Sequence, residues 1–155
     1  KFISLHFAPY LNERVATDEQ QDAFETIIDF LDGVNIVIPD DLKEYLDDAA
    51  KTIDLVDVSK KAAASVAAAI QDPEQYLKDN REMFERYKEV KASDAYKNTP
   101  GYRLQELFAQ LNRENGYNDV FIPAMRRLSS SYREYYEKLL KANEVFLKSY
   151  RGVRF

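Results

Sequence analysis

Residues 17–33, which read TDEQQDAFETIIDFLDG, decide the fold class of this chain. Thr17 and Gln20 have the spacing of a capping box, in which each side chain satisfies a free backbone N–H at a helix start. Glycine is favoured where helices end, so Gly33 predicts the end of this one. Apolar residues recur three and four positions apart between these signals, at Ala23, Phe24, Ile27, Ile28 and Leu31. The stretch therefore predicts an amphipathic helix that packs one face against other helices.

The same kind of pattern continues along the chain. Further helices are expected over residues 40–53, 59–71, 73–90, 100–115 and 123–150, with a short helical turn at 94–97. Residues 34–38 are mostly β-branched and too few for a helix, so they predict an extended connector before Pro39, either buried or exposed. Residues 1–16 precede these patterns and are expected to form an irregular N-terminal arm.

Two of the expected helices would organise the others. Residues 59–71 are almost entirely alanine and other small or apolar residues, which favours a central, largely buried helix. Residues 123–150 carry a heptad stripe, which indicates either the spine of a bundle or, as the weaker alternative, an oligomer seam. The sequence thus predicts an all-α fold, a compact antiparallel bundle of about six helices with a long C-terminal helix, in a single domain over residues 1–155.

Composition agrees with this fold class. The 155 residues are 45% hydrophobic and 13% aromatic, which is enough to build a core, and the chain has 4 Gly and 5 Pro, fewer than a turn-rich β-sandwich needs. The stretches 33–39 and 116–123 resemble each other, each running from Gly to Pro. They indicate either a duplicated helical unit or two corners built from the same stop and start residues, the second being favoured.

The segment 99–116 resembles the repeats of insect gut allergens, which are helical proteins that enclose lipid. The resemblance carries no diagnostic motif, and no family is assigned from it.

Residues able to carry out catalysis are scarce. The chain has no Cys, and His6 is its only histidine, which excludes Cys-ligated zinc, thiol nucleophiles and paired-histidine metal sites. It also lacks the glycine-rich loops that hold phosphates. Several acids occur between residues 40 and 48, at the start of an expected helix, where carboxylates commonly complement the helix dipole. No catalytic residue, metal or cofactor is expected, and an enzyme that uses carboxylates alone is the weakest functional hypothesis.

Charge is distributed unevenly along the chain. Residues 1–57 contain 14 acids and 4 bases, a net charge of −10, whereas residues 120–155 contain 3 acids and 8 bases, a net charge of +5. The bases of the last helix either form a docking face for an anion or pair with the acidic half of the chain. The overall net charge of −5 argues against nucleic acid as the partner. The candidate basic surface consists of Arg126, Arg127, Arg133 and Lys141.

These observations favour a non-enzymatic binding protein that holds a lipid or another apolar small molecule between helices. The alternative is a protein–protein interaction module, such as a secreted effector, an inhibitor or an immunity-type protein, that finds its partner by charge. The large apolar residues expected to line a ligand cavity are Phe24, Ile28, Phe84, Phe108, Tyr132 and Phe146.

The sequence also bears on whether the protein spans a membrane and on where it is located. No apolar run approaches the roughly 18 residues needed to cross a bilayer, so a membrane-spanning protein is not expected. The start at Lys1, followed by the apolar residues 2–7, fits a removed secretion leader and slightly favours an extracellular location. The oligomeric state is left open.

Overall fold

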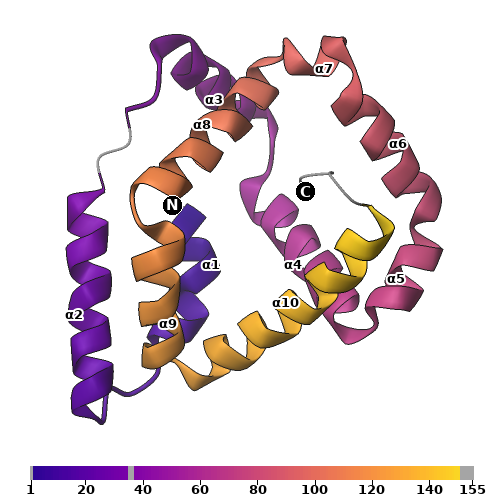
Figure 1. Cartoon of the computed structure of the whole chain (residues 1–155). Coiled ribbons are helices and arrows are strands. Elements are labelled where there is room, and N and C mark those ends of the chain that lie inside the picture. Colours follow the sequence, from indigo (N-terminus) through magenta and orange to yellow (C-terminus); the bar gives the residue numbers. More distant parts are fainter. Residues whose placement is uncertain (1, 35–36, 151–155) are drawn as a thin grey trace. The chain divides into compact units, whose positions relative to one another are not determined.

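The computed structural model describes residues 2–34 and 37–150. These residues form ten α-helices and one π-helix and contain no β-strand, which confirms the all-α prediction (Figure 1). The helices are α1 (Phe2–Leu11), α2 (Asp18–Gly33), α3 (Asp40–Thr52), α4 (Leu55–Gln71), α5 (Pro73–Asp79), α6 (Arg81–Ala92), α7 (Asp94–Lys97), α8 (Pro100–Glu114), the π-helix η1 (Tyr117–Phe121), α9 (Ile122–Leu128) and α10 (Ser130–Ser149).

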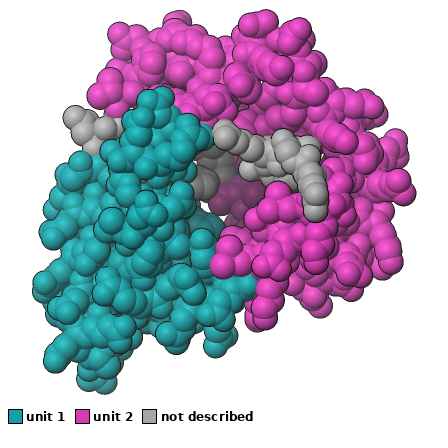
Figure 2. Space-filling model, viewed as in Figure 1, with its two compact units in different colours: residues 1–36, 108–137 teal, residues 37–107, 138–155 magenta. Residues whose placement is uncertain are grey.

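The chain divides into two compact units (Figure 2). Unit 1 consists of residues 1–36 and 108–137, and unit 2 of residues 37–107 and 138–155. The boundaries fall inside α8 and inside α10, so each of these helices contributes residues to both units.

The core of unit 1 forms where α2 packs against α9. Ala23 of α2 and Ala124 of α9 are completely buried, which allows the two helices to approach closely. Aromatic rings extend this core: Phe7 of α1 meets the ring of Phe121 edge to face at 4.9 Å, and the ring of Tyr132 at 5.5 Å. The remaining buried members are Ile27, Ile122, Met125 and Leu128. In Figure 1, α2 lies alongside α9 within this unit.

Unit 2 has a smaller core. The ring of Phe84 on α6 lies 5.3 Å from that of Phe146 and 5.6 Å from that of Tyr150. Leu77 of α5 completes the buried cluster, and Tyr76 packs against its edge. The most extensive helix contacts in this unit, α4 with α5, α5 with α6 and α6 with α7, join helices that follow one another along the chain.

Several local predictions are confirmed. Thr17 and Gln20 form the expected capping box at the start of α2. The carboxylate of Asp72 caps α5 by accepting a hydrogen bond of 3.0 Å from the backbone N–H of Gln75. The predicted turn at 94–97 is α7. Gly116 follows the end of α8 and has the left-handed backbone conformation, with φ of 75°. This conformation favours a residue without a Cβ.

The capping residue Gln20 also makes a tertiary contact. Its side-chain oxygen accepts from the backbone N–H groups of Ala16 and Thr17, at 2.9 and 3.2 Å. Its side-chain NH₂ donates to the carbonyl oxygen of Leu128 at 3.1 Å, where α9 ends. One side chain therefore both starts α2 and attaches it to the end of α9.

The predicted continuous helix over 123–150 is wrong. The chain leaves helical geometry at Ser129 (φ −119°, ψ 119°), so that α9 and α10 are separate helices. The Ser129 hydroxyl oxygen accepts a 3.0 Å hydrogen bond from the backbone N–H of Tyr132, as an N-cap side chain does. The heptad pattern did not reveal the break, because the apolar spacing continues across it.

The expectation of a central helix over 59–71 is also wrong. No side chain of α4 that the structure describes is buried. Alanine has the highest helix propensity of all residues, so its abundance stabilises a helix without requiring a packed environment.

Two smaller expectations fail as well. Residues 2–11 of the predicted irregular arm form α1. The predicted helix over 73–90 is interrupted at Asn80, whose side-chain NH₂ donates to the carbonyl of Tyr76 at 2.9 Å and competes with continued helix. In the predicted connector, Val37 is 73% exposed, while residues 35 and 36 lie outside the described part of the chain.

The two Gly-to-Pro stretches also differ where the structure describes them. Val34 is extended after α2, whereas Tyr117–Phe121 form η1.

The two roles of Gln20 can be separated by a Gln20→Glu substitution. A glutamate retains the acceptor for the N-terminal N–H groups but loses the NH₂ that donates to Leu128, and it places two acceptors next to each other. We expect the free energy of unfolding to fall by about 1 kcal/mol in urea denaturation. If only the local cap matters, the added negative charge at the helix start will instead leave stability unchanged or raise it slightly.

Candidate binding surfaces

The six predicted cavity residues are divided between the two units and differ in burial. Tyr132 is buried in the core of unit 1, and Phe84 and Phe146 are in ring contact in unit 2. Phe24 and Ile28 lie on one face of α2 and are 38% and 40% exposed. Phe108 on α8 is also exposed. Within unit 2, Phe84 and Phe146 share one core, and within unit 1 Tyr132 is buried while Phe24, Ile28 and Phe108 are exposed.

Unit 2 leaves much of its apolar surface uncovered. Among the described residues it buries five hydrophobic side chains and exposes ten large ones, whereas unit 1 buries nine and exposes five. Contiguous rows of exposed apolar side chains mark surfaces that bind a ligand or partner, and Met83, Tyr87 and Val90 form such a row on α6. The exposed residues of unit 2 are Val37, Tyr45, Ile53, Val56, Val58, Met83, Tyr87, Val90, Leu140 and Leu147.

A line of carboxylates runs along α2. The helix contains six acids and no base, and five of the acids are spaced alternately by four and three residues. At 3.6 residues per turn this spacing places the five on one face of the helix, opposite the buried Ala23 and Ile27. We call this set the acidic line; its members are Asp18, Asp22, Glu25, Asp29 and Asp32, all exposed.

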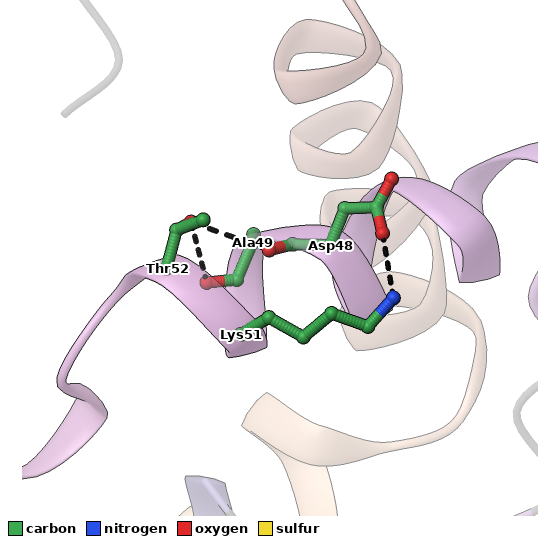
Figure 3. Close-up of polar contacts among 4 residues, drawn as sticks. All are labelled: Asp48, Ala49, Lys51 and Thr52. Atoms are coloured by element: carbon green, nitrogen blue, oxygen red, sulfur yellow. Dashed lines mark hydrogen bonds and ion pairs between the residues drawn. The ribbon is translucent and has the colours of Figure 1, made fainter.

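The acids of α3 are arranged differently. Lys43 pairs with Asp40 and Lys51 pairs with Asp48, each at 2.9 Å and three residues apart. At the end of α3 the Thr52 hydroxyl also donates to the carbonyl oxygens of Asp48 and Ala49 (Figure 3). None of the ion pairs found among the described residues involves a carboxylate of α2.

The acidic line costs stability. Like charges three or four residues apart on a helix repel each other by a few tenths of a kcal/mol per pair, and the line contains four such successive pairs. Asp29 and Asp32 also lie near the C-terminal end of α2, where the helix dipole disfavours negative charge. Within the described residues, no ion pair neutralises the charge of this helix.

The four residues of the predicted basic surface are not equivalent. The guanidinium of Arg126 lies 5.3 Å from the centre of the Tyr136 ring, and a terminal nitrogen is 3.8 Å from a Glu137 carboxylate oxygen. Its Nε is buried without a hydrogen-bond partner. Arg127, Arg133 and Lys141 are exposed. Arg126 therefore contributes to packing within unit 1, and the other three are left as the solvent-facing part of this set.

Glu13 anchors the N-terminal connector to the start of α10. Its carboxylate accepts hydrogen bonds from the Ser129 hydroxyl at 2.6 Å, from the Ser131 hydroxyl, and from the backbone N–H groups of Ser130 and Ser131 at 3.2 and 3.3 Å. Hydrogen bonds from the two serine hydroxyls hold the pKa of Glu13 below its usual value. The serine run before an apolar stripe is an N-cap signal, but the acceptor 116 residues away could not be read from sequence.

His6 and several tyrosines pack against other aromatic rings in unit 1. The His6 ring meets Phe7 edge to face at 4.7 Å, and burial lowers its pKa. Burial raises the pKa of Tyr117, Tyr132 and Tyr135 above the ordinary tyrosine value. Within the described residues, no group of three or more His, Cys, Asp or Glu side chains is placed to hold a metal ion.

Comparison with protein families, curated proteins and solved structures finds no match to this chain. In the part of the chain that the structure describes, no helix is both long and apolar enough to cross a bilayer.

The Glu13 contact predicts a pH-dependent difference between the wild-type protein and Glu13→Gln. Since folding lowers the pKa of Glu13, its contribution to stability is present above the unfolded pKa, about 4.3, and is lost as the pH falls through the folded value. The wild-type melting temperature should exceed that of the variant at neutral pH, and the difference should shrink towards about pH 3. Glu89→Gln on α6 is the matched charge control. A difference that does not vary with pH contradicts the contact.

The position of Arg126 predicts a difference between two adjacent residues. Arg126→Met removes a guanidinium stacked on Tyr136 and should lower the melting temperature by a few degrees, corresponding to about 1 kcal/mol. Arg127→Met removes the same charge from an exposed position and should leave it nearly unchanged. If calorimetry shows the same change in melting temperature for both variants, at low and at high salt, the loss of charge alone explains the effect and the packing of Arg126 does not contribute.

Proposed function

We propose that this protein is a non-enzymatic helical binding protein whose unit 2 takes up a lipid or another apolar small molecule. The observation that carries the proposal is the excess of exposed over buried hydrophobic side chains in unit 2. A bound apolar molecule would cover part of this surface and complete a core that the unit does not complete by itself.

The exposed residues have the spacing of buried helix faces. On α6, Met83, Tyr87 and Val90 follow one another by four and three residues, as core positions do, yet all three are exposed. Leu140 and Leu147 repeat this on α10, two turns apart. An apolar ligand is the occupant that such faces favour, because it requires no matching charge.

The energetics are sufficient for a fatty-acid-length chain. Each methylene removed from water contributes about 0.8 kcal/mol. About ten buried methylenes therefore match the −8 kcal/mol of a micromolar complex. A longer acyl chain leaves a margin for the entropy lost on binding.

Protein recognition is the second candidate function, and the acidic line of α2 favours it. Uncompensated charge beside exposed apolar side chains is the composition of a surface that selects an oppositely charged partner.

Lipid binding is tested with a fluorescent fatty-acid probe and with native mass spectrometry after organic extraction. We expect a co-purifying amphiphile and saturable probe binding at micromolar or tighter affinity, reversed by unlabelled fatty acid. Val90→Asp in unit 2 should weaken probe binding about tenfold or more, because a carboxylate would have to be desolvated against the acyl chain. The matched control is Val120→Asp in unit 1, since the two valines are 48% and 44% exposed.

Two results would overturn the proposal. An empty extract together with probe binding that does not saturate excludes an apolar ligand. Equal loss of affinity in both valine variants shows that the probe adheres to exposed apolar surface in general.

A further inference from the structure

Two strips of different chemistry lie side by side on the exposed surface of α2. One is the acidic line, and the other consists of Phe24 and Ile28, one turn apart and about 100° around the helix axis from it. We infer that this face docks a cationic amphipathic helix of a partner protein. The inference rests on the second candidate function, protein recognition, and is independent of lipid binding.

The shape of the acidic line indicates the kind of ligand. At 1.5 Å per residue, the stretch from Asp18 to Asp32 spans about 21 Å. Carboxylates spread along such a line do not converge on one point, and no metal-binding group occurs among the described residues. An extended row of cations, such as Lys and Arg side chains one helical turn apart, matches this geometry.

Phe24 and Ile28 supply the apolar part of the face. Ala23 and Ile27 are buried against α9, and this packing fixes which side of α2 is turned outwards. Phe24 and Ile28 are not among the side chains buried by this packing, and they are 38% and 40% exposed. Side chains at positions i and i+4 are the usual anchors when two helices pack side by side.

Other occupants fit less well. Nucleic acid and anionic membranes would be repelled by the acidic line. A second copy of this chain would bring a net charge of −5 and, through its own α2, no base. A cationic helix relieves the repulsion along the acidic line and covers the two apolar side chains at the same time.

The probe for the test is a synthetic helical peptide of roughly 18 residues, with Leu at positions i and i+4 beside a row of Lys. A scrambled peptide of the same composition controls for net charge. Binding is measured by fluorescence anisotropy with the whole chain, between roughly 0.05 and 0.2 M salt. We expect saturable binding of the amphipathic peptide, at least about tenfold tighter than that of the scrambled peptide, and weakening as salt increases.

The variants separate the acidic line from acidity in general. The triple change Asp22→Asn, Glu25→Gln and Asp29→Asn should weaken peptide binding about tenfold or more and reduce its salt dependence. It should also raise the melting temperature, because repulsion along the helix is removed, which verifies that the variant is folded. The control removes the same charge at exposed positions elsewhere, by Glu44→Gln, Asp47→Asn and Asp119→Asn, and should retain binding.

A second pair of variants tests the apolar anchors. Phe24→Ser should weaken binding of the amphipathic peptide several-fold, while Phe108→Ser, at a similarly exposed phenylalanine of unit 1, should not.

The proposal is overturned if the amphipathic and scrambled peptides bind equally, if the two triple variants lose affinity equally, or if no saturable binding occurs. None of these outcomes bears on the fatty-acid probe. Conversely, Val90→Asp should leave peptide binding intact, so failure of one proposal is distinguishable from failure of the other.

Discussion

Unit 1 depends on one side chain, Gln20, that acts locally and at long range. It caps the start of α2 and donates to the carbonyl of Leu128, so the residue that starts one helix also fixes the end of another. A few residues away, Glu13 holds the start of α10 through Ser129 and Ser131. The junction between α9 and α10 is therefore held by the chain around residues 13–20, and α2 and α9 pack against each other through buried alanines.

The two units use their apolar residues differently. Unit 1 combines small residues at a close helix contact with a cluster of aromatic rings, and among its described residues it buries nine hydrophobic side chains and exposes five large ones. Unit 2 builds its core from a few aromatic residues of α5, α6 and the end of α10. It leaves apolar side chains of several helices exposed. Exposed apolar surface is unfavourable in water. A ligand that covers it is therefore bound with the favourable free energy of removing that surface from water. This difference directs the lipid proposal to unit 2.

The acidic line of α2 adds a second kind of unfavourable surface. Its charges repel one another, and the lysines that pair with Asp40 and Asp48 of α3 have no counterpart on α2. Retaining such charge lowers stability by an amount that binding of an oppositely charged partner can restore. The two proposed surfaces therefore follow the same physical logic, although one is apolar and the other electrostatic, and they lie in different units.

The sequence by itself determined the all-α class, the capping box of α2 and the ends of most helices, because these features depend on neighbours within about four residues. Only the tertiary structure decided that the final helix breaks at Ser129, that α4 is exposed, and that Phe24 and Ile28 face outwards while Tyr132 is buried. Helical spacing shows which residues share a face, but whether that face is covered depends on partners distant in sequence, such as Glu13 for Ser129.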